Sequence, residues 1–165
     1  MTDPLGSGRH TAWTLAVEGE PVAPTPIALP ASEPLPPTDA ELVHTWILDD
    51  GDMGGMSGMG SFTIDGQSWP EVPVVRTTAG VPARFDVTNR SEMRHPFHLH
   101  GQRLALIGDA LAVDGLGWKD TFDVPVGETR SFVTYADNPG DWLYHCHILE
   151  HAEDGMAGIL SVEAP

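Results

Sequence analysis

The sequence predicts an all-β domain, a sandwich or barrel built from short strands. Eight short segments rich in β-branched and aromatic residues follow one another from residue 42 to the end of the chain. Gly, Pro, Asn or Asp residues separate these segments at turn-like intervals, and no convincing amphipathic helix appears between them. The expected strands are Leu42–Leu48, Ser61–Asp65, Val72–Arg76, Ala83–Thr88, Leu104–Ile107, Thr129–Tyr135, Trp142–His147 and Ala157–Val162.

The residues before this domain predict an extended arm. Thr11–Glu18 has the alternation of a single strand, with no neighbouring strand to pair with. Pro21–Pro37 carries seven prolines in seventeen residues, a composition that forbids regular structure and makes a semi-rigid linker. We therefore divide the chain into a proline-rich N-terminal arm, residues 1–40, and a β domain, residues 41–165.

Composition limits the partners. Eight Lys and Arg residues against 24 Asp and Glu residues give a formal net charge of −16, so neither nucleic acid nor an anionic membrane is an expected partner. No apolar run approaches the ~18 residues of a membrane span, and the first residues do not resemble a signal peptide, so any export signal would lie outside this sequence. One cysteine excludes an internal disulfide and leaves the compartment open.

The stretch from Trp142 to Met156, W-L-Y-H-C-H-I-L-E-H-A-E-D-G-M, holds candidate metal ligands. Cys146 is the only cysteine, and His151 and Met156 follow at five-residue steps. Two imidazoles, one thiolate and a weak thioether form the blue-copper ligand set. Side chains alternate along a strand, so the two histidines flanking Cys146 point away from a metal that it holds. His151 can return to that metal after a turn, and a second imidazole must come from elsewhere.

A second motif, M-R-H-P-F-H-L-H-G-Q, occupies Met93–Gln102. His98 and His100 share one face of a strand, whereas His95 falls on the other face. If the strands pair in the register that places His95 beside Cys146, two metal environments result. The first has the ligands His95, Cys146, His151 and Met156, and the second has His98, His100, His145 and His147.

Zinc and cupin-type sites fit this ligand pattern less well than copper does. Zinc favours tetrahedral sites without a thioether, and a cupin-type site would need a downstream acid and a third histidine that are missing. Isolated core histidines are usually only hydrogen-bonded, and we assign this ordinary role to His10 and His44. Trp142 and Tyr144 are expected to pack around the site and exclude water.

Between the first two expected strands, Asp49–Gly60 carries Met53, Met56 and Met59 at every third position. A weak thioether site for Cu(I) and a flexible glycine loop both fit this pattern. The loop is favoured because nothing in the sequence fixes the geometry of the three methionines.

The two histidine motifs together resemble the last cupredoxin domain of the multicopper oxidase family, which includes laccases and cuprous oxidases. F-T-I-D-G (Phe62–Gly66), W-K-D-T (Trp118–Thr121) and V-P-V-G-E (Val124–Glu128) support the resemblance, which covers roughly residues 41 to 165. It implies a cupredoxin-like Greek-key β-barrel or sandwich, with copper as the cofactor.

The resemblance also implies roles for the candidate ligands. Residues that match His95, Cys146, His151 and Met156 hold the type 1 copper, which accepts electrons from the reductant. Residues that match His98 (type 2 copper) and His100, His145 and His147 (type 3 pair) supply half of the trinuclear cluster that reduces dioxygen to water. Cys146 would pass electrons through His145 and His147 to that cluster, so these three are the expected catalytic residues.

The chain departs from the family in two ways. The family's cluster uses eight histidines, but here only eight exist in the whole chain, two of them assigned to type 1 copper and two, His10 and His44, isolated. Several bacterial relatives have an acid directly after the residue matching His151, where this chain has Ala152, followed by Glu153 and Asp154. Half of the cluster and the usual proton-delivering residue are therefore missing.

Two functions follow. The first is the electron-accepting domain of an oxidase that oxidises phenols, amines or metal ions with O2 as acceptor. Its partners would be the remaining cupredoxin domains or a partner subunit, and the family suggests a periplasmic or extracellular location. The second is a stand-alone type 1 copper protein for electron transfer or copper binding, without oxidase activity.

Overall fold

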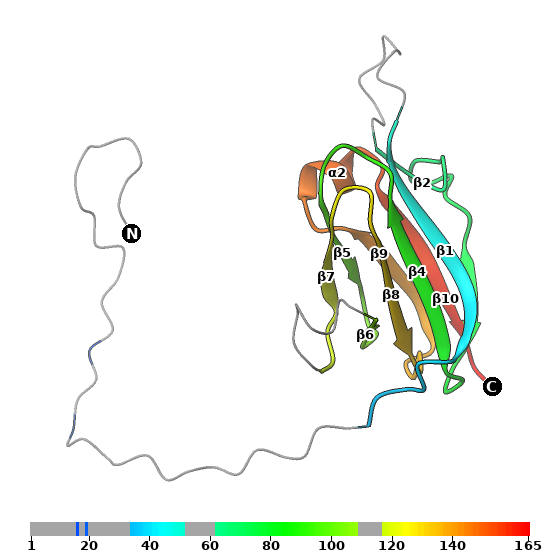
Figure 1. Ribbon diagram of the computed structural model, residues 1–165. Coiled ribbons are helices and arrows are strands. Elements are labelled where there is room, and N and C mark those ends of the chain that lie inside the picture. Colours follow the sequence, from blue (N-terminus) through cyan, green and yellow to red (C-terminus); the bar gives the residue numbers. More distant parts are fainter. Residues whose placement is uncertain (1–15, 17–18, 20–33, 52–61, 109–116) are drawn as a thin grey trace. The chain divides into compact units, whose positions relative to one another are not determined.

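The computed structural model describes residues 16, 19, 34–51, 62–108 and 117–165 (Figure 1). Its β domain is a sandwich of two five-stranded sheets, with strand orders β2-β1-β4-β8-β6 and β3-β10-β9-β5-β7. The strands are β1 Glu41–Asp50, β2 Phe62–Ile64, β3 Val75–Thr78, β4 Ala83–Asn89, β5 His95–Leu99, β6 Ala105–Ile107, β7 Thr121–Val124, β8 Thr129–Thr134, β9 Gly140–Cys146 and β10 Ala157–Glu163. The predicted all-β, cupredoxin-like fold is confirmed.

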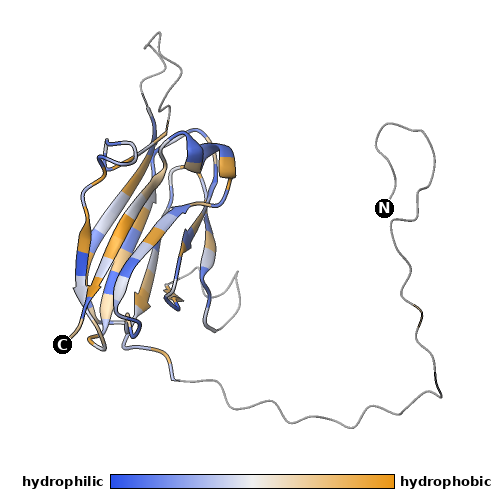
Figure 2. Ribbon diagram, turned by 180° about the vertical axis from the view of Figure 1, so that it is seen from behind, coloured by the Kyte–Doolittle hydropathy of each residue, from blue (hydrophilic) through white to orange (hydrophobic). Residues whose placement is uncertain are grey.

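The core lies between the two sheets, and Trp46 of β1 is at its centre. This fully buried side chain stacks on Phe85 and Phe132 of its own sheet, with ring centroids 5.1 and 6.1 Å away. Across the sandwich it meets Phe97 at 5.3 Å and Tyr144 at 4.7 Å. Inward and outward residues alternate along the strands, as the hydropathy colouring of Figure 2 shows. Aromatic rings therefore fill the centre of the interface between the sheets, and buried aliphatic side chains surround them.

Most expected strands lie within three residues of the observed ones, and the differences have local causes. The expected strand Val72–Arg76 is found as β3, Val75–Thr78, since Pro73 cannot donate a ladder hydrogen bond. The short strand β7 was not expected as an element of its own. One short helix, α2 (Leu149–Glu153), follows β9, and its five residues are too few to show a helical period.

Several predictions concern residues outside the described part of the chain. These are the strand Thr11–Glu18, most of the proline-rich linker, His10, and Met53, Met56 and Met59. The first described strand begins at Glu41, and the division into an arm and a β domain at residue 40 stays a prediction. In the part of the chain that the structure describes, no helix is long and apolar enough to span a membrane.

Candidate metal centre

Both candidate ligand sets are organised by the pairing of β5 with β9. The register is antiparallel, with Phe97 opposite Cys146, His98 opposite His145 and Leu99 opposite Tyr144. The residue paired directly with Cys146 is therefore Phe97, and His95, two residues earlier on β5, still places its ring beside Cys146, with Nδ1 3.4 Å from Sγ. The offset of two residues preserves side-chain parity, so His95 and Cys146 lie on the inner face.

The first cluster lies inside one end of the sandwich. The Cys146 Sγ atom is 3.4 Å from His95 Nδ1 and 3.7 Å from His151 Nδ1, and the two imidazole nitrogens are 3.2 Å apart. All three residues are buried. His95 comes from the start of β5, Cys146 from the end of β9 and His151 from α2. One sulfur and two nitrogens thus converge on a single point, as metal ligands do.

The return loop after β9 brings Met156 back to the same end. The Cys146 backbone N–H donates to Met156 O at 3.1 Å, and the Met156 N–H donates to His151 O at 2.9 Å. The Met156 side chain is fully buried. The loop is closed by α2, so the turn expected after Cys146 is one helical turn.

Burial sets the protonation of this cluster. It raises the pKa of the Cys146 thiol to about 11, partly offset by the Ile148 N–H that donates to Sγ. It lowers the pKa of His95 to about 4, with help from neighbouring His151, whose own pKa is also lowered by burial. At neutral pH both imidazoles are therefore uncharged and can donate lone pairs. A metal ion that binds the thiolate must displace its proton.

Two polar residues behind His95 were not singled out from the sequence. Ser91 Oγ lies 2.6 Å from His95 Nε2 and donates to Asn89 Oδ1 at 2.8 Å. The Asn89 amide in turn donates to the backbone carbonyls of Met93 and Val124. The hydroxyl proton has two oxygen acceptors, Asn89 Oδ1 and Met93 O at 2.9 Å. With its proton on either oxygen, Oγ accepts from His95 Nε2–H, and we assign His95 the tautomer that leaves Nδ1 bare toward Cys146. Serine and asparagine near a turn give no sequence signal for such a role.

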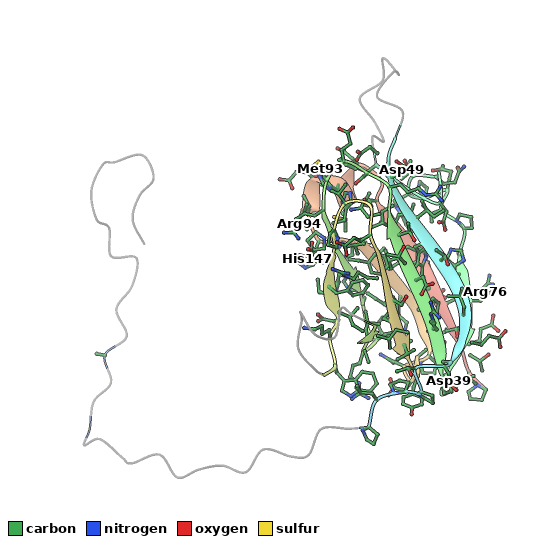
Figure 3. The ribbon with its side chains drawn as sticks, viewed as in Figure 1. Asp39, Asp49, Arg76, Met93, Arg94 and His147 are labelled. Carbon is green, nitrogen blue, oxygen red and sulfur yellow. The ribbon has the colours of Figure 1, made fainter. Side chains whose placement is uncertain are left out.

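The four remaining histidines of the two motifs gather on the outer face of the second sheet. Ligand nitrogens of His98, His100 and His145 lie within 4.8 Å of one another, and His100 Nε2 is 3.1 Å from His145 Nε2. His147 is exposed and joins through its ring, whose centroid is 5.5 Å from that of His98. Figure 3 shows His147 on the β5–β7 side of the sandwich. The histidines of the two motifs therefore lie on two faces of the sheet, as their parity along the strands predicts, and their role as metal ligands stays a prediction.

Hydrogen bonds also orient this outer group. His145 Nδ1 lies 2.7 Å from Cys146 O, and a carbonyl oxygen can only accept, so the His145 proton is on Nδ1. His98 Nδ1 lies 2.9 Å from Asp120 O, with the same consequence. Burial lowers the pKa of both His98 and His100. Neutral imidazoles with a bare Nε2 are good ligands for copper and zinc.

The residues assigned no metal role have other partners. His44 Nε2 is 2.8 Å from Asp65 Oδ2, and neither residue belongs to either histidine cluster. Tyr144 is fully buried and Trp142 is partly buried against the core, as expected for packing residues. Ala152 is half-buried on α2, and Glu153 and Asp154 beyond it are exposed.

The donor set of the first cluster fits copper. A buried thiolate, two neutral imidazoles and a nearby buried thioether are soft and borderline donors, whereas zinc sites rarely include a thioether. The outer histidines offer imidazole nitrogens, which suit copper or zinc.

Comparison with known proteins agrees with this chemistry. The sequence model of the multicopper oxidase family matches residues 42–165. A copper resistance protein A homolog from Pseudomonas syringae pv. tomato is 34% identical over 105 residues, 62% of this chain and 17% of that protein. Multicopper oxidase mco from Staphylococcus epidermidis is 38% identical over 73 residues, 42% of this chain and 16% of that protein.

Solved structures give the same result. A multicopper oxidase from Campylobacter jejuni, described as a metallo-oxidase, is 29% identical with a TM-score of 0.65, over 78% of this chain and 31% of that one. A multi-copper oxidase from Pediococcus acidilactici is 26% identical with a TM-score of 0.66, over 89% of this chain and 31% of that one. The chain thus spans 16–17% of the length of these curated relatives and 31% of these structures.

Proposed function

Because the chain belongs to the multicopper oxidase family and its cofactor is therefore copper, we propose that it is the electron-accepting copper domain of a larger oxidase. His95, Cys146, His151 and Met156 hold one copper as a type 1 site. His98, His100, His145 and His147 supply half of a trinuclear copper site. The observation that carries the proposal is the triangle of Cys146 Sγ, His95 Nδ1 and His151 Nδ1, with sides of 3.2 to 3.7 Å.

Copper, when bound, supplies one-electron redox chemistry at the inner site and dioxygen reduction at the completed outer site. The chain's own residues prepare both places. Burial of His95, Cys146 and His151 excludes water and keeps the imidazoles neutral. The consecutive residues His145, Cys146 and His147 join the two ligand sets through a few covalent bonds. This covalent link would carry electrons between the two faces.

The rest of the oxidase must come from elsewhere. The outer face offers four histidines, and the chain spans less than a third of the length of the solved structures quoted above. We propose that another cupredoxin domain or a partner subunit provides the missing ligands. The reductant is a phenol, an amine or a metal ion, and a periplasmic or extracellular location is proposed from the family.

The first experiment tests the type 1 site. The copper-loaded, oxidised chain should show an intense red-region absorption band and a narrow copper hyperfine splitting, because charge is shared between copper and the Cys146 sulfur. Cys146→Ser should abolish both signals. His44→Gln, which changes a histidine paired with Asp65 instead, is the matched control and should keep them. An oxidised, copper-loaded wild type without the band would contradict the assignment.

The second experiment tests the missing half. Fully copper-loaded chain with a good one-electron donor should show no sustained oxygen uptake to water, because four histidines are too few for a three-copper cluster. Sustained turnover by a monomer would refute this expectation. Turnover found only in a dimer would indicate a two-fold assembly in which two outer faces combine eight histidines. The mass in solution, measured in parallel, separates these outcomes.

A further inference from the structure

One outer ligand has a hydrogen-bonding support from the neighbouring edge strand. Three adjacent strands place Thr121, His98 and His145 in one row, since His98 is opposite Thr121 of β7 on one side and opposite His145 of β9 on the other. Directly paired residues of antiparallel strands project to the same face. The Thr121 hydroxyl therefore stands on the same face as the proposed copper ligands.

The contacts within this row define the direction of each hydrogen bond. His98 Nδ1 is 2.8 Å from Thr121 Oγ1 and 2.9 Å from the Asp120 carbonyl oxygen. The Thr121 hydroxyl donates its proton to the Asp120 carboxylate, Oδ1, at 2.9 Å. With that proton used, Oγ1 presents only lone pairs to His98. Both neighbours of Nδ1 are thus acceptors, and the imidazole must carry its proton there.

We propose that Thr121, itself held by the Asp120 carboxylate, is a positioning residue for the copper ligand His98. The hydroxyl fixes the rotation of the imidazole ring and keeps its lone pair on Nε2. It also makes the ring a stronger donor, because hydrogen bonds to the outer nitrogen of a metal-bound histidine raise its basicity. This role rests on the proposed function, in which His98 binds copper.

The row sits where such support has most effect. His98 is only half-buried, and its ring lies beside the imidazoles of three other proposed ligands: His100, His145 and His147. In the described part of the chain β7 is an edge strand, paired with β5 alone. The Asp120 carbonyl provides one acceptor for the Nδ1–H group, and the Thr121 hydroxyl provides a second one, which restricts the rotation of the ring further. Loss of an outer hydrogen bond of this kind typically weakens metal binding by about 10- to 100-fold.

The test uses the full chain and follows His98 itself. Long-range nitrogen–proton NMR of the metal-free protein at pH 8 reports which imidazole nitrogen carries the proton, with signals assigned by His98→Gln. Thr121→Val removes the hydroxyl but keeps shape and strand propensity. Thr121→Ser restores the hydroxyl. Thr129→Val is the matched control, because the Thr129 hydroxyl pairs with that of Thr88 on the other sheet.

Anaerobic titration with Cu(I), read on the His98 signals, gives the second readout. We expect Thr121→Val to shift the His98 nitrogen signals and weaken its Cu(I) affinity by about tenfold, while Thr121→Ser and Thr129→Val stay near wild type. If Thr121→Val matches Thr129→Val in both readouts, the proposal is wrong. Should Thr121→Val not fold, Asp120→Ala must shift the same signals, or the proposal falls. A wild-type His98 that binds no copper would instead overturn the proposed function, independently of the metal-free spectra.

Discussion

Removal of the Ser91 hydroxyl should cost measurable stability, because it would leave a buried proton of a proposed ligand without an acceptor. Ser91, Asn89 and His95 are 3%, 0% and 0% exposed. In Ser91→Ala the His95 Nε2–H loses its 2.6 Å contact. Asn89 keeps its other partners, including the Ser91 backbone N–H, which donates to Asn89 Oδ1 at 2.9 Å. The Met93 backbone N–H, which donates to Ser91 Oγ at 3.2 Å, loses its acceptor as well. Met93 is exposed, so water can replace that partner, and the main cost falls on the buried His95.

The expected magnitude follows from this accounting. An unpaired buried donor costs about 1–3 kcal/mol, so we expect Ser91→Ala to lower the free energy of unfolding by about 2 kcal/mol. With a urea m-value of about 1–3 kcal/mol/M, the unfolding midpoint should fall by roughly 1 M. The cost should appear in the metal-free chain, because the hydrogen bond exists without copper.

Equilibrium urea unfolding of metal-free wild type and Ser91→Ala at pH 7.5 measures this cost. Ser161→Ala is the control: it removes a half-buried strand hydroxyl for which the described part of the chain shows no side-chain hydrogen bond. Its effect should stay within about 0.5 kcal/mol, as for ordinary surface substitutions. A loss in Ser91→Ala no larger than that of Ser161→Ala would refute the tautomer assigned to His95.

Two further predictions concern the same site. Met156→Leu should keep copper and raise the site's reduction potential, because loss of a weak donor destabilises Cu(II) relative to Cu(I). Potentiometric titration measures the potential. A lowered potential or loss of copper would contradict the role of Met156. The metal-free chain should lose stability as the pH falls from 6.5 toward 4. Burial and the neighbouring His151 lower the pKa of His95 from its unfolded value near 6.5 to about 4. Between these two values the unfolded chain binds more protons than the folded chain, so a falling pH favours unfolding. From these two pKa values, the free energy of unfolding should be about 2 kcal/mol lower at pH 5 than at pH 7.5. Urea unfolding at both pH values measures this difference. An equal loss in His95→Gln would assign the effect to other groups.

The strands could be predicted because their local patterns are strong. β4 alternates buried and half-buried residues along its length and was expected within one residue of its observed end. β7 was missed because its four residues, T-F-D-V, are too few for a convincing alternation, and only its pairing with β5 makes it a strand. Short edge strands depend on a partner that a linear pattern does not contain.

The candidate ligands could be assigned to two faces because parity along a strand is a local property. The register between β5 and β9 could not be obtained in this way, and it differs by two residues from the one that would place His95 opposite Cys146. Ser91, Asn89 and Thr121 were not singled out for a related reason. Each is an ordinary polar residue whose role arises from a neighbour across a strand pair or a turn.

The position of β9 in the sheet is what allows one strand to serve two sites. A slip of one residue would exchange the faces of Cys146 and its two flanking histidines, so the proposed centres require a fixed register. β9 lies between β10 and β5 and is hydrogen-bonded on both sides. At its end the Cys146 N–H donates to Met156 O and the His147 N–H donates to Pro96 O at 2.7 Å. These last two bonds tie the strand to the loop of Met156 on one side and to the residue after His95 on the other. The ligands are thus held in register by the same backbone segments that supply them.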